Sequence, residues 1–237
     1  MAESSALSVY LRERRLAAGL ARAELAARAQ MAPLLVTQIE TGALVPNTAM
    51  LQRLFDSLDV PPWYRKHILV LGLPSVDTGA APTAPSTEDL ADLGSLTHPA
   101  CYQRFPTMDL LAANAEYQRI FPGTGAGVNL LEWMFLNPAA KKALLDWTTE
   151  AQVLVHAFRM LSPLAPTQRV TAITTACAVS PDWDAVWASE LRPQDVARRH
   201  VRVRDRTTGV ERRYLLRIYD PAFPTRPWWL YRMIPSR

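Results

Sequence analysis

The sequence predicts two domains of different fold class: an all-α N-terminal helix-turn-helix domain and an α+β C-terminal domain with an antiparallel sheet. First, five segments with apolar residues at helical spacing lie between residues 6 and 72. Second, residues 74–97 are rich in Pro, Ala, Ser, Thr and acidic residues, which is typical of a linker, and the second half of this segment, Thr87 to Leu96, could form a short helix. Third, the rest of the chain has two strand patterns, then helical patterns, then three strand patterns. We therefore expect domains at residues 1–73 and 98–237.

The N-terminal domain is expected to consist of five short helices. They are expected at about residues 6–18, 21–29 and 33–40, after Pro46, and after Pro61-Pro62. Gly19 closes the first helix, and Asn47 is a good N-cap for the fourth. Only a few residues separate the second helix from the third, as in a helix-turn-helix, whose second helix enters the major groove of double-stranded DNA. DNA is therefore the first partner to consider, and a generic helical bundle with a tight turn is the alternative.

The C-terminal domain is expected to begin and end with strands. The expected strands lie at about residues 101–105 and 109–113, on both sides of a turn at Thr208-Gly209, and at 228–234. The expected helices lie at 114–121, after a cap at Asn129, from Pro138 to about residue 161, at 167–179, and after Ser180. Two strands, then helices, then three strands describe an α+β domain with an antiparallel sheet.

Composition and motifs describe an ordinary globular protein without a recognisable catalytic centre. The chain has 237 residues, 49% hydrophobic and 20% charged, which is enough for two domains. It has no apolar run of transmembrane length and no signal-peptide pattern at its start, so we expect a cytoplasmic protein without a membrane partner. Cys101 and Cys177 are far apart and no metal-ligand spacing occurs, so no metal or cofactor is expected. No GxSxG, HExxH or Walker motif is present, so we do not expect an enzyme.

The net charge of +4 is unevenly distributed. Residues 1–72 hold 8 basic and 6 acidic side chains, and residues 73–98 hold four acidic and no basic ones. Residues 99–237 hold 18 basic and 12 acidic side chains. Of the 26 basic residues, all but three are Arg. This preference fits phosphate contact, and it also fits a GC-rich genome.

Residues 7–58 carry the pattern of a known family of DNA-binding domains. The matching residues are Leu11, Arg15, Gly19-Leu20, Glu24-Leu25-Ala26, Ala29, Ile39-Glu40, Gly42, Pro46, Leu51, Leu54 and Leu58. On these residues the segment resembles the Cro/repressor-like helix-turn-helix of the XRE family. The resemblance implies a transcriptional regulator that binds DNA, commonly as a homodimer on a palindrome.

Six residues are the candidate DNA contacts. They are Arg22, Arg28, Leu34, Thr37, Gln38 and Thr41. The two arginines suit contacts with phosphate or guanine, and the polar side chains of the third helix suit base edges. Leu34 can contact only a thymine methyl group. The alternative for each of them is a solvated surface residue.

Several positions depart from the pattern of the XRE family. They are Ala21, Arg22, Gln30 and Ala32, where the family often has Ser, Gln, Gly and a Ser or Thr helix cap. Pro33 suits the first turn of a helix, but Leu34 and Leu35 cannot hydrogen-bond to base edges. We therefore expect weak sequence discrimination, reliance on DNA shape, or a dimer that adds contacts.

The C-terminal half also carries the landmarks of a known family. In chain order they are Pro99-Ala100, residues 109–114, Asn129-Leu130-Leu131, Phe135-Leu136-Asn137-Pro138, Asp146-Trp147, Phe158-Arg159, Ser180-Pro181, Trp183 and Trp187. On these residues the half resembles the ligand-binding domain of MmyB-like regulators, which has a PAS-like fold. The resemblance implies a sensor that holds a fatty-acid-like or other apolar small molecule between helices and sheet. The usual His-Pro-x-x-Gly hairpin is replaced by residues 204–209.

Aromatic side chains on the predicted helices are the candidate lining of this ligand pocket. They are Trp133, Phe135, Trp147, Phe158, Trp183 and Trp187. The alternative is that these rings only pack the domain core.

An arginine cluster occupies residues 198–217. Its members are Arg198, Arg199, Arg202, Arg204, Arg206, Arg212, Arg213 and Arg217. Alternation along a strand places Arg202, Arg204 and Arg206 on one face and the intervening valines on the other. The interpretations left open are a solvated sheet face, an anionic ligand site, and a supplementary contact with DNA phosphate.

Together these observations predict a ligand-responsive DNA-binding regulator. We expect its C-terminal domain to dimerise, or to shift orientation, when it binds an apolar ligand. DNA half-sites recur about one helical turn apart (~34 Å), so a small movement between two recognition helices would change affinity. The alternative function is a protein-interaction module with a degenerate helix-turn-helix, which the apolar residues Met31, Leu34 and Leu35 favour.

Overall fold

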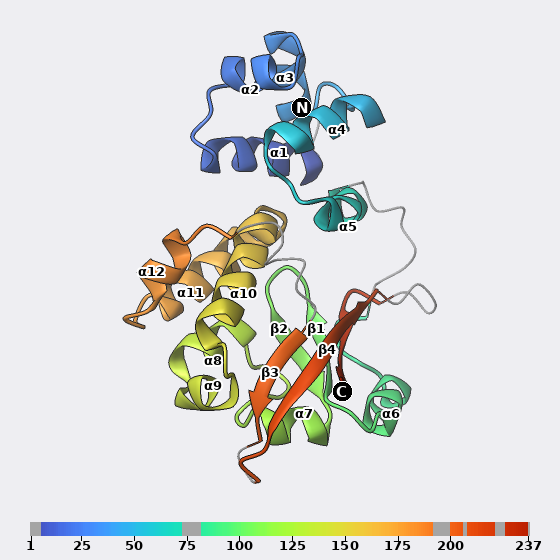
Figure 1. The fold of residues 1–237 in the computed structure, drawn as a ribbon. Helices are drawn as coiled ribbons and strands as arrows, with labels where there is room; N and C mark the ends of the chain where they lie inside the picture. The colour runs from blue at the N-terminus through green and yellow to red at the C-terminus, as the bar shows by residue number, and fades with distance from the viewer. Residues whose placement is uncertain (1–5, 73–81, 192–199, 206–207, 221–225, 237) are drawn as a thin grey trace. The chain divides into compact units, whose positions relative to one another are not determined.

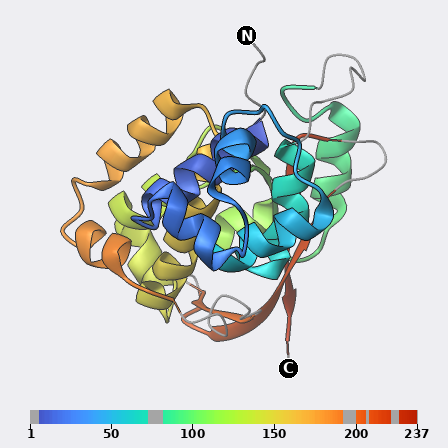
Figure 2. The ribbon, with the colours of Figure 1, turned by 90° about the horizontal axis from the view of Figure 1, so that it is seen from above.

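The structure, a computed structural model, describes residues 6–72, 82–191, 200–205, 208–220 and 226–236 (Figures 1 and 2). The chain divides into two compact units. The N-terminal unit contains Met1–Thr78 and Arg159–Thr167, and the C-terminal unit contains Gly79–Phe158 and Gln168–Arg237. The division differs from the expected domains because a short segment of the C-terminal half belongs to the N-terminal unit. Arg198, Arg199 and Arg206 of the arginine cluster lie outside the described residues.

The five expected N-terminal helices are confirmed. They are α1 (Ala6–Ala17), α2 (Arg22–Arg28), α3 (Pro33–Glu40), α4 (Thr48–Ser57) and α5 (Pro62–Gly72). Their apolar faces meet in one core, where Tyr10, Leu25 and Ile68 are fully buried. The downstream segment adds a short 3-10 helix, η1 (Ser162–Leu164), which packs against α1 and α5. The helices therefore share a single hydrophobic core, as burial of their apolar stripes requires.

Local capping explains where these helices begin. Asn47 Oδ1 accepts a hydrogen bond from the Met50 backbone N–H at 2.9 Å, which confirms it as the N-cap of α4. The N-caps of α2 and α3 are alanines, which have no side-chain acceptor. At α2 the Glu24 carboxylate compensates in part, because it accepts from the Ala21 N–H at 2.6 Å. At α3, Pro33 occupies the first turn, where a missing N–H has no cost.

The C-terminal unit is built on one five-stranded antiparallel sheet, as expected. Its strands are β1 (Ala100–Arg104), β2 (Asp109–Ala113), β3 (His200–Arg204), β4 (Glu211–Tyr219) and β5 (Trp229–Pro235). Their order across the sheet is β2-β1-β5-β4-β3. The last strand of the chain therefore lies in the centre, between β1 and β4, and joins the two ends of this unit.

Within the described residues of this unit, seven α-helices accompany the sheet. They are α6 (Thr87–Ser95), α7 (Ala115–Ile120), α8 (Leu130–Leu136), α9 (Pro138–Ala143), α10 (Trp147–Leu161), α11 (Thr167–Cys177) and α12 (Trp183–Ala188). The Asn129 side chain accepts from the backbone N–H groups of Leu131 and Glu132, which confirms it as the cap of α8. The short helix expected in the second half of the linker is confirmed as α6, which buries Leu93 against Ala100 and Tyr102 of β1.

The expectation of one long helix from Pro138 to about residue 161 is wrong. The chain leaves the helix after α9, and Leu144 adopts an extended conformation. Leu144 forms a bridge with Val203 of β3, and the Leu145 N–H donates to the Arg202 carbonyl at 3.1 Å. Pairing with a distant strand thus overrides the local helical pattern, and the helix resumes at α10.

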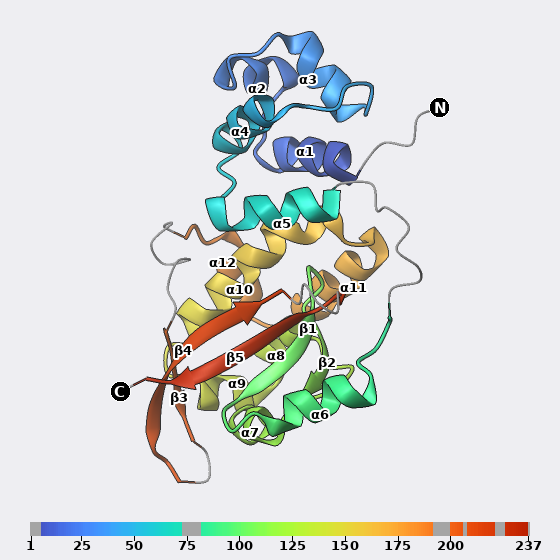
Figure 3. The same ribbon diagram turned by 90° about the vertical axis from the view of Figure 1, so that its right-hand side faces the viewer.

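The helices of the C-terminal unit cover the two sheet faces unequally (Figure 3). Helices α8, α9 and α10 lie behind the sheet in Figure 3, where side chains such as Val203, Tyr214 and Met233 are buried. Helix α6 lies on the opposite face and packs over β1 and β2. Among the described helices of this unit, none lies over β3, β4 and β5 on that second face.

Candidate DNA interface and ligand-binding core

Helices α2 and α3 pack together in the way a helix-turn-helix requires. Leu25 and Ala26 of α2 are fully buried, and Val36 and Ile39 of α3 are 1% exposed. Burial of the small Ala26 side chain fits the close packing of α2 against α3. The turn passes through Gln30 in the left-handed region, with φ 53°, where the XRE pattern usually has Gly. The Arg53 guanidinium of α4 donates to the Gln30 carbonyl at 3.3 Å and holds this turn.

The side of α3 that faces away from the core presents the candidate base readers. Leu34, Thr37, Gln38 and Thr41 follow the three- and four-residue spacing of one helix face. Leu34 is 66% exposed, Thr41 is exposed, and the two residues between them are half-buried. The structure therefore brings these four side chains together on one accessible surface, with Arg28 exposed on α2.

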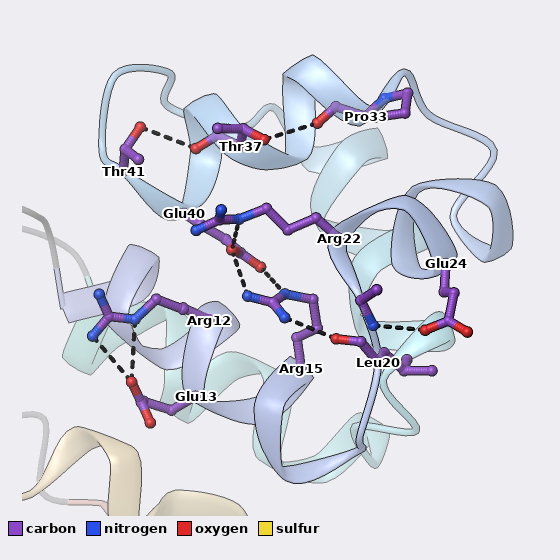
Figure 4. A network of polar contacts seen from close by, with 11 residues as sticks. Arg12, Glu13, Arg15, Leu20, Arg22, Glu24, Pro33, Thr37, Glu40 and Thr41 are labelled. Atoms are coloured by element: carbon purple, nitrogen blue, oxygen red, sulfur yellow. Dashed lines mark hydrogen bonds and ion pairs between the residues drawn. The ribbon is translucent and has the colours of Figure 1, made fainter.

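The two threonines of this face are already engaged as donors. Thr37 Oγ1 donates to the Pro33 carbonyl at 3.2 Å, and Thr41 Oγ1 donates to the Thr37 carbonyl at 3.0 Å (Figure 4). Each hydroxyl oxygen keeps its lone pairs as acceptors. In this conformation both threonines can accept from the amino groups of adenine or cytosine in the major groove.

A three-residue ionic network lies between α1, α2 and α3 (Figure 4). Arg15 binds the Glu40 carboxylate through two nitrogens, at 2.6 and 3.0 Å. Arg15 Nη1 also donates to the Leu20 carbonyl at 2.8 Å. Arg22 Nε donates to the second oxygen of the same carboxylate at 2.8 Å. The Glu40 side chain is 1% exposed and that of Arg15 is 7% exposed, whereas that of Arg22 is 46% exposed.

The electrostatics of this network keep Glu40 ionised. Burial by itself would raise the pKa of the Glu40 carboxyl, but hydrogen bonds from Arg15 and Arg22 outweigh burial, and the pKa lies below its ordinary value. The hydrogen bond to Glu40 likewise raises the pKa of Arg15. The sequence pattern contained Arg15 and Glu40 as family positions but did not reveal that they pair. It also did not reveal that Glu40 orients Arg22, a candidate DNA contact.

The six candidate ligand-pocket aromatics separate into different parts of the C-terminal unit. Phe135 lies 5.7 Å from Trp147 and 4.9 Å from Trp183, and Trp183 lies 5.0 Å from Trp187, between ring centroids. These four rings, from α8, α10 and α12, form what we call the aromatic group. All are buried except the half-buried Trp187.

The other two candidate pocket residues, Trp133 and Phe158, are not part of the aromatic group. Trp133, also on α8, lies 5.6 Å from the Phe121 ring and donates from Nε1 to the Pro122 carbonyl at 2.9 Å. Phe158 is fully buried on α10. Within the aromatic group, Trp147 Nε1 donates to the Met134 carbonyl at 3.0 Å. The indole N–H groups of Trp133 and Trp147 are thus satisfied by backbone carbonyls, which leaves their rings to make apolar contacts.

Comparison with known families follows the same division of the chain. The sequence model of the MmyB-like transcription regulator ligand binding domain matches residues 90–213, more than half of the chain. The chain belongs to this family. A helix-turn-helix domain model matches residues 6–67 of the MmyB-like chain, which covers α1 to α4 and most of α5. A search of curated proteins found no match.

This MmyB-like chain therefore combines a DNA-binding domain with a ligand-binding domain, and it is a ligand-responsive, DNA-binding transcription regulator. Its domains are those of a regulator of transcription. Across the described residues, no helix is long and apolar enough to cross a membrane. In the same part of the chain, no group of three or more His, Cys, Asp or Glu side chains could hold a metal ion.

Proposed function

We propose that this protein binds double-stranded DNA as a homodimer, in the cytoplasm, with α3 in the major groove. The observation that carries the proposal is the accessible face of α3, where Leu34, Thr37, Gln38 and Thr41 lie together opposite the buried side of the helix. Exposed Arg28 supplies a further cation for phosphate or guanine. A homodimer would double these contacts and would offset the small number of polar base readers on α3.

Fluorescence anisotropy on DNA from upstream of the protein's own coding sequence tests this proposal. Gln38→Ala and Arg28→Ala should each weaken binding about fivefold or more, since one good contact with a base edge contributes roughly 1–3 kcal/mol. Gln118→Ala is the matched control, because Gln118 is an exposed glutamine on α7. Unchanged affinity in both test variants, with salt-sensitive binding by the wild type, would contradict the proposed interface.

We further propose that the C-terminal unit binds an apolar, fatty-acid-like molecule at the aromatic group. The half-buried Trp187 marks the accessible end of this group, and Phe135, Trp147 and Trp183 continue it into the core. A long acyl chain would replace apolar ring–ring contacts with apolar contacts between the chain and the rings. Few polar groups would therefore lose hydrogen-bond partners. Binding there would move α12 relative to α8 and α10, which is a route from ligand to dimer geometry.

Native mass spectrometry of the purified protein tests the ligand and the dimer together. We expect a dimeric mass and a co-purified apolar molecule. Palmitate titration should then show about fivefold or greater loss of affinity in Trp187→Ala, since an aromatic contact contributes on the order of 1 kcal/mol. Trp229→Phe is the control, because Trp229 stacks on Phe105, away from the aromatic group. Equal palmitate affinity in the wild type and Trp187→Ala would refute this site.

A protein-interaction module is the second candidate function, and one observation favours it. Leu34 is 66% exposed and Val45, just after α3, is 83% exposed, so apolar surface is presented beside the candidate DNA readers. Under this alternative, Arg22→Ala together with Gln38→Ala would leave DNA affinity untouched. Under the proposed function, the same pair of substitutions should collapse it.

A further inference from the structure

One face of the sheet gathers arginines from three neighbouring strands. Strand register pairs Arg202 with Arg213 and Arg217 with Arg232. Directly paired residues point to the same side of a sheet, and residues two apart along a strand do so as well. These four residues, with Arg204 of β3, therefore share one face, which we call the arginine face.

The arginine face is on the α6 side of the sheet. Arg232 is in register with Ala100 of β1, and Ala100 packs with Leu93 of α6. Helix α6 covers β1 and β2 there, and none of the described helices of this unit covers β3, β4 and β5 (Figure 3). Arg213 and Arg217 are accordingly exposed.

Carboxylates neutralise only part of this face. Arg202 makes two hydrogen bonds to Asp146, at 2.8 and 2.7 Å. Arg204 pairs with Glu211 at 2.8 Å. Among the described residues, Arg213 and Arg217 have no ion-pair partner.

The fifth arginine, Arg232, contacts a neutral group and an aromatic ring. Its Nε donates to His98 Nε2 at 2.9 Å, and its guanidinium lies 5.7 Å from the Tyr219 ring centroid. Because His98 Nε2 accepts this hydrogen bond, the imidazole is in its neutral form, and burial and the Arg232 charge both lower the pKa of His98. The arginine face therefore carries three guanidinium charges that no described carboxylate balances.

The register also sets like charges directly opposite each other, which destabilises a sheet. Two such pairs, Arg202–Arg213 and Arg217–Arg232, stand on adjacent strands. A bound anion between them would remove this repulsion. Arg213 and Arg217 lie four residues apart, about 13 Å along β4, which corresponds to roughly four phosphate steps of one DNA strand.

We propose that the arginine face is a second DNA-contacting surface, which binds backbone phosphates through Arg213, Arg217 and Arg232. This inference rests on the proposed function, because the helix-turn-helix is what brings a duplex to this protein. The guanidinium fork suits bidentate contact with phosphate oxygens. The basic excess of residues 99–237, 18 against 12 acidic residues, is larger than that of residues 1–72, so this surface would add substantially to affinity. Contacts of this kind strengthen binding without reading sequence, which complements the sparse base readers of α3.

The salt dependence of DNA binding by the full-length protein tests this inference. Each phosphate contact contributes about 0.9 to the slope of log K against log salt concentration. Arg213→Gln with Arg217→Gln should lower the magnitude of that slope by about 1.8, on the same upstream duplex. The matched control is Arg212→Gln with Lys142→Gln, which removes the same charge from exposed residues. Arg212 directly precedes Arg213 in β4, so its side chain points to the other side of the sheet.

The outcomes separate this inference from the proposed function. A lower slope in Arg213→Gln/Arg217→Gln and a wild-type slope in the control support the arginine face. Equal slopes in both double variants overturn it, because only net charge would then matter. If Gln38→Ala loses binding while the two double variants have equal salt slopes, only the arginine face is refuted. The proposed function then stands. A wild-type protein that does not bind the duplex overturns both. Far-UV circular dichroism confirms that each variant is folded.

Discussion

We expect the two arginines that bind Glu40 to differ in role, with Arg15 stabilising the fold and Arg22 contacting DNA. Substituting each of them by Met distinguishes these roles. Arg15 is 7% exposed, makes two hydrogen bonds to Glu40 and one to the Leu20 carbonyl, and joins α1 to α3. Arg22 is 46% exposed and makes a single hydrogen bond to the same carboxylate. Arg15→Met should destabilise the N-terminal unit by about 3 kcal/mol, because it leaves a buried carboxylate without its main partner. Arg22→Met should cost about 0–1 kcal/mol, since water screens the exposed pair.

Hydrogen exchange of the amides in α1 and α3 measures this difference, because it reports local opening without interference from the C-terminal unit. Combining each substitution with Glu40→Gln gives the two coupling energies, and the Arg15 coupling should be the larger. DNA affinity provides the complementary readout, since Arg22→Met should weaken binding while the unit remains folded. If Arg22→Met destabilises α3 as much as Arg15→Met does, Arg22 is a structural residue and the reasoning is refuted.

Three further predictions concern stability. The pKa of Glu40 is lowered by folding, so its stabilising contribution is complete above about pH 4.3 and is lost as the pH falls through the folded value. Urea titrations between about pH 3 and 5 should therefore show that acid lowers the free energy of unfolding less in Glu40→Gln than in the wild type. An equal pH dependence of this free energy in the two proteins would contradict the prediction. Asn47→Ala should lower the stability of α4 by about 1 kcal/mol, measured by hydrogen exchange, because the capping hydrogen bond to the Met50 N–H is lost. Unchanged exchange would show that this cap does not stabilise α4. Trp183→Ala should destabilise the C-terminal unit by about 3–5 kcal/mol in tryptophan-detected unfolding, and a loss below about 1 kcal/mol would show that the site collapses freely around the Phe135 ring.

Most of the N-terminal fold was predictable because its signals are local. Apolar spacing placed all five helices, and the side chain of Asn47 marked the start of α4 within a few residues of sequence. The exposed face of α3 followed from the same periodicity, because its buried side was identifiable at Val36 and Ile39. The network of Arg15, Arg22 and Glu40 was not predictable, since its partners are up to 25 residues apart and meet only when three helices pack.

The C-terminal unit shows the same division between local and distant causes. The sequence indicated all five described strands, but the central place of β5 depends on pairing between the two ends of this unit. The break between α9 and α10 arises from the bridge of Leu144 to Val203, which no local pattern contains. Six aromatic residues on predicted helices suggested one pocket lining. The structure separates Trp133 from the aromatic group, because Trp133 and Phe135 make their ring contacts with different parts of the unit.

The sequence by itself determined most of the helices, the five described strands, the families that the two halves resemble, and which face of α3 is accessible. These properties depend on interactions within one turn of helix or between alternate residues of a strand. Only the tertiary structure decided that Glu40 holds both Arg15 and Arg22, and that the arginines of β3, β4 and β5 share one face. The physical reason is that ionic contacts and strand register join residues far apart in the chain. Which charged side chains share a surface is therefore decided only by folding.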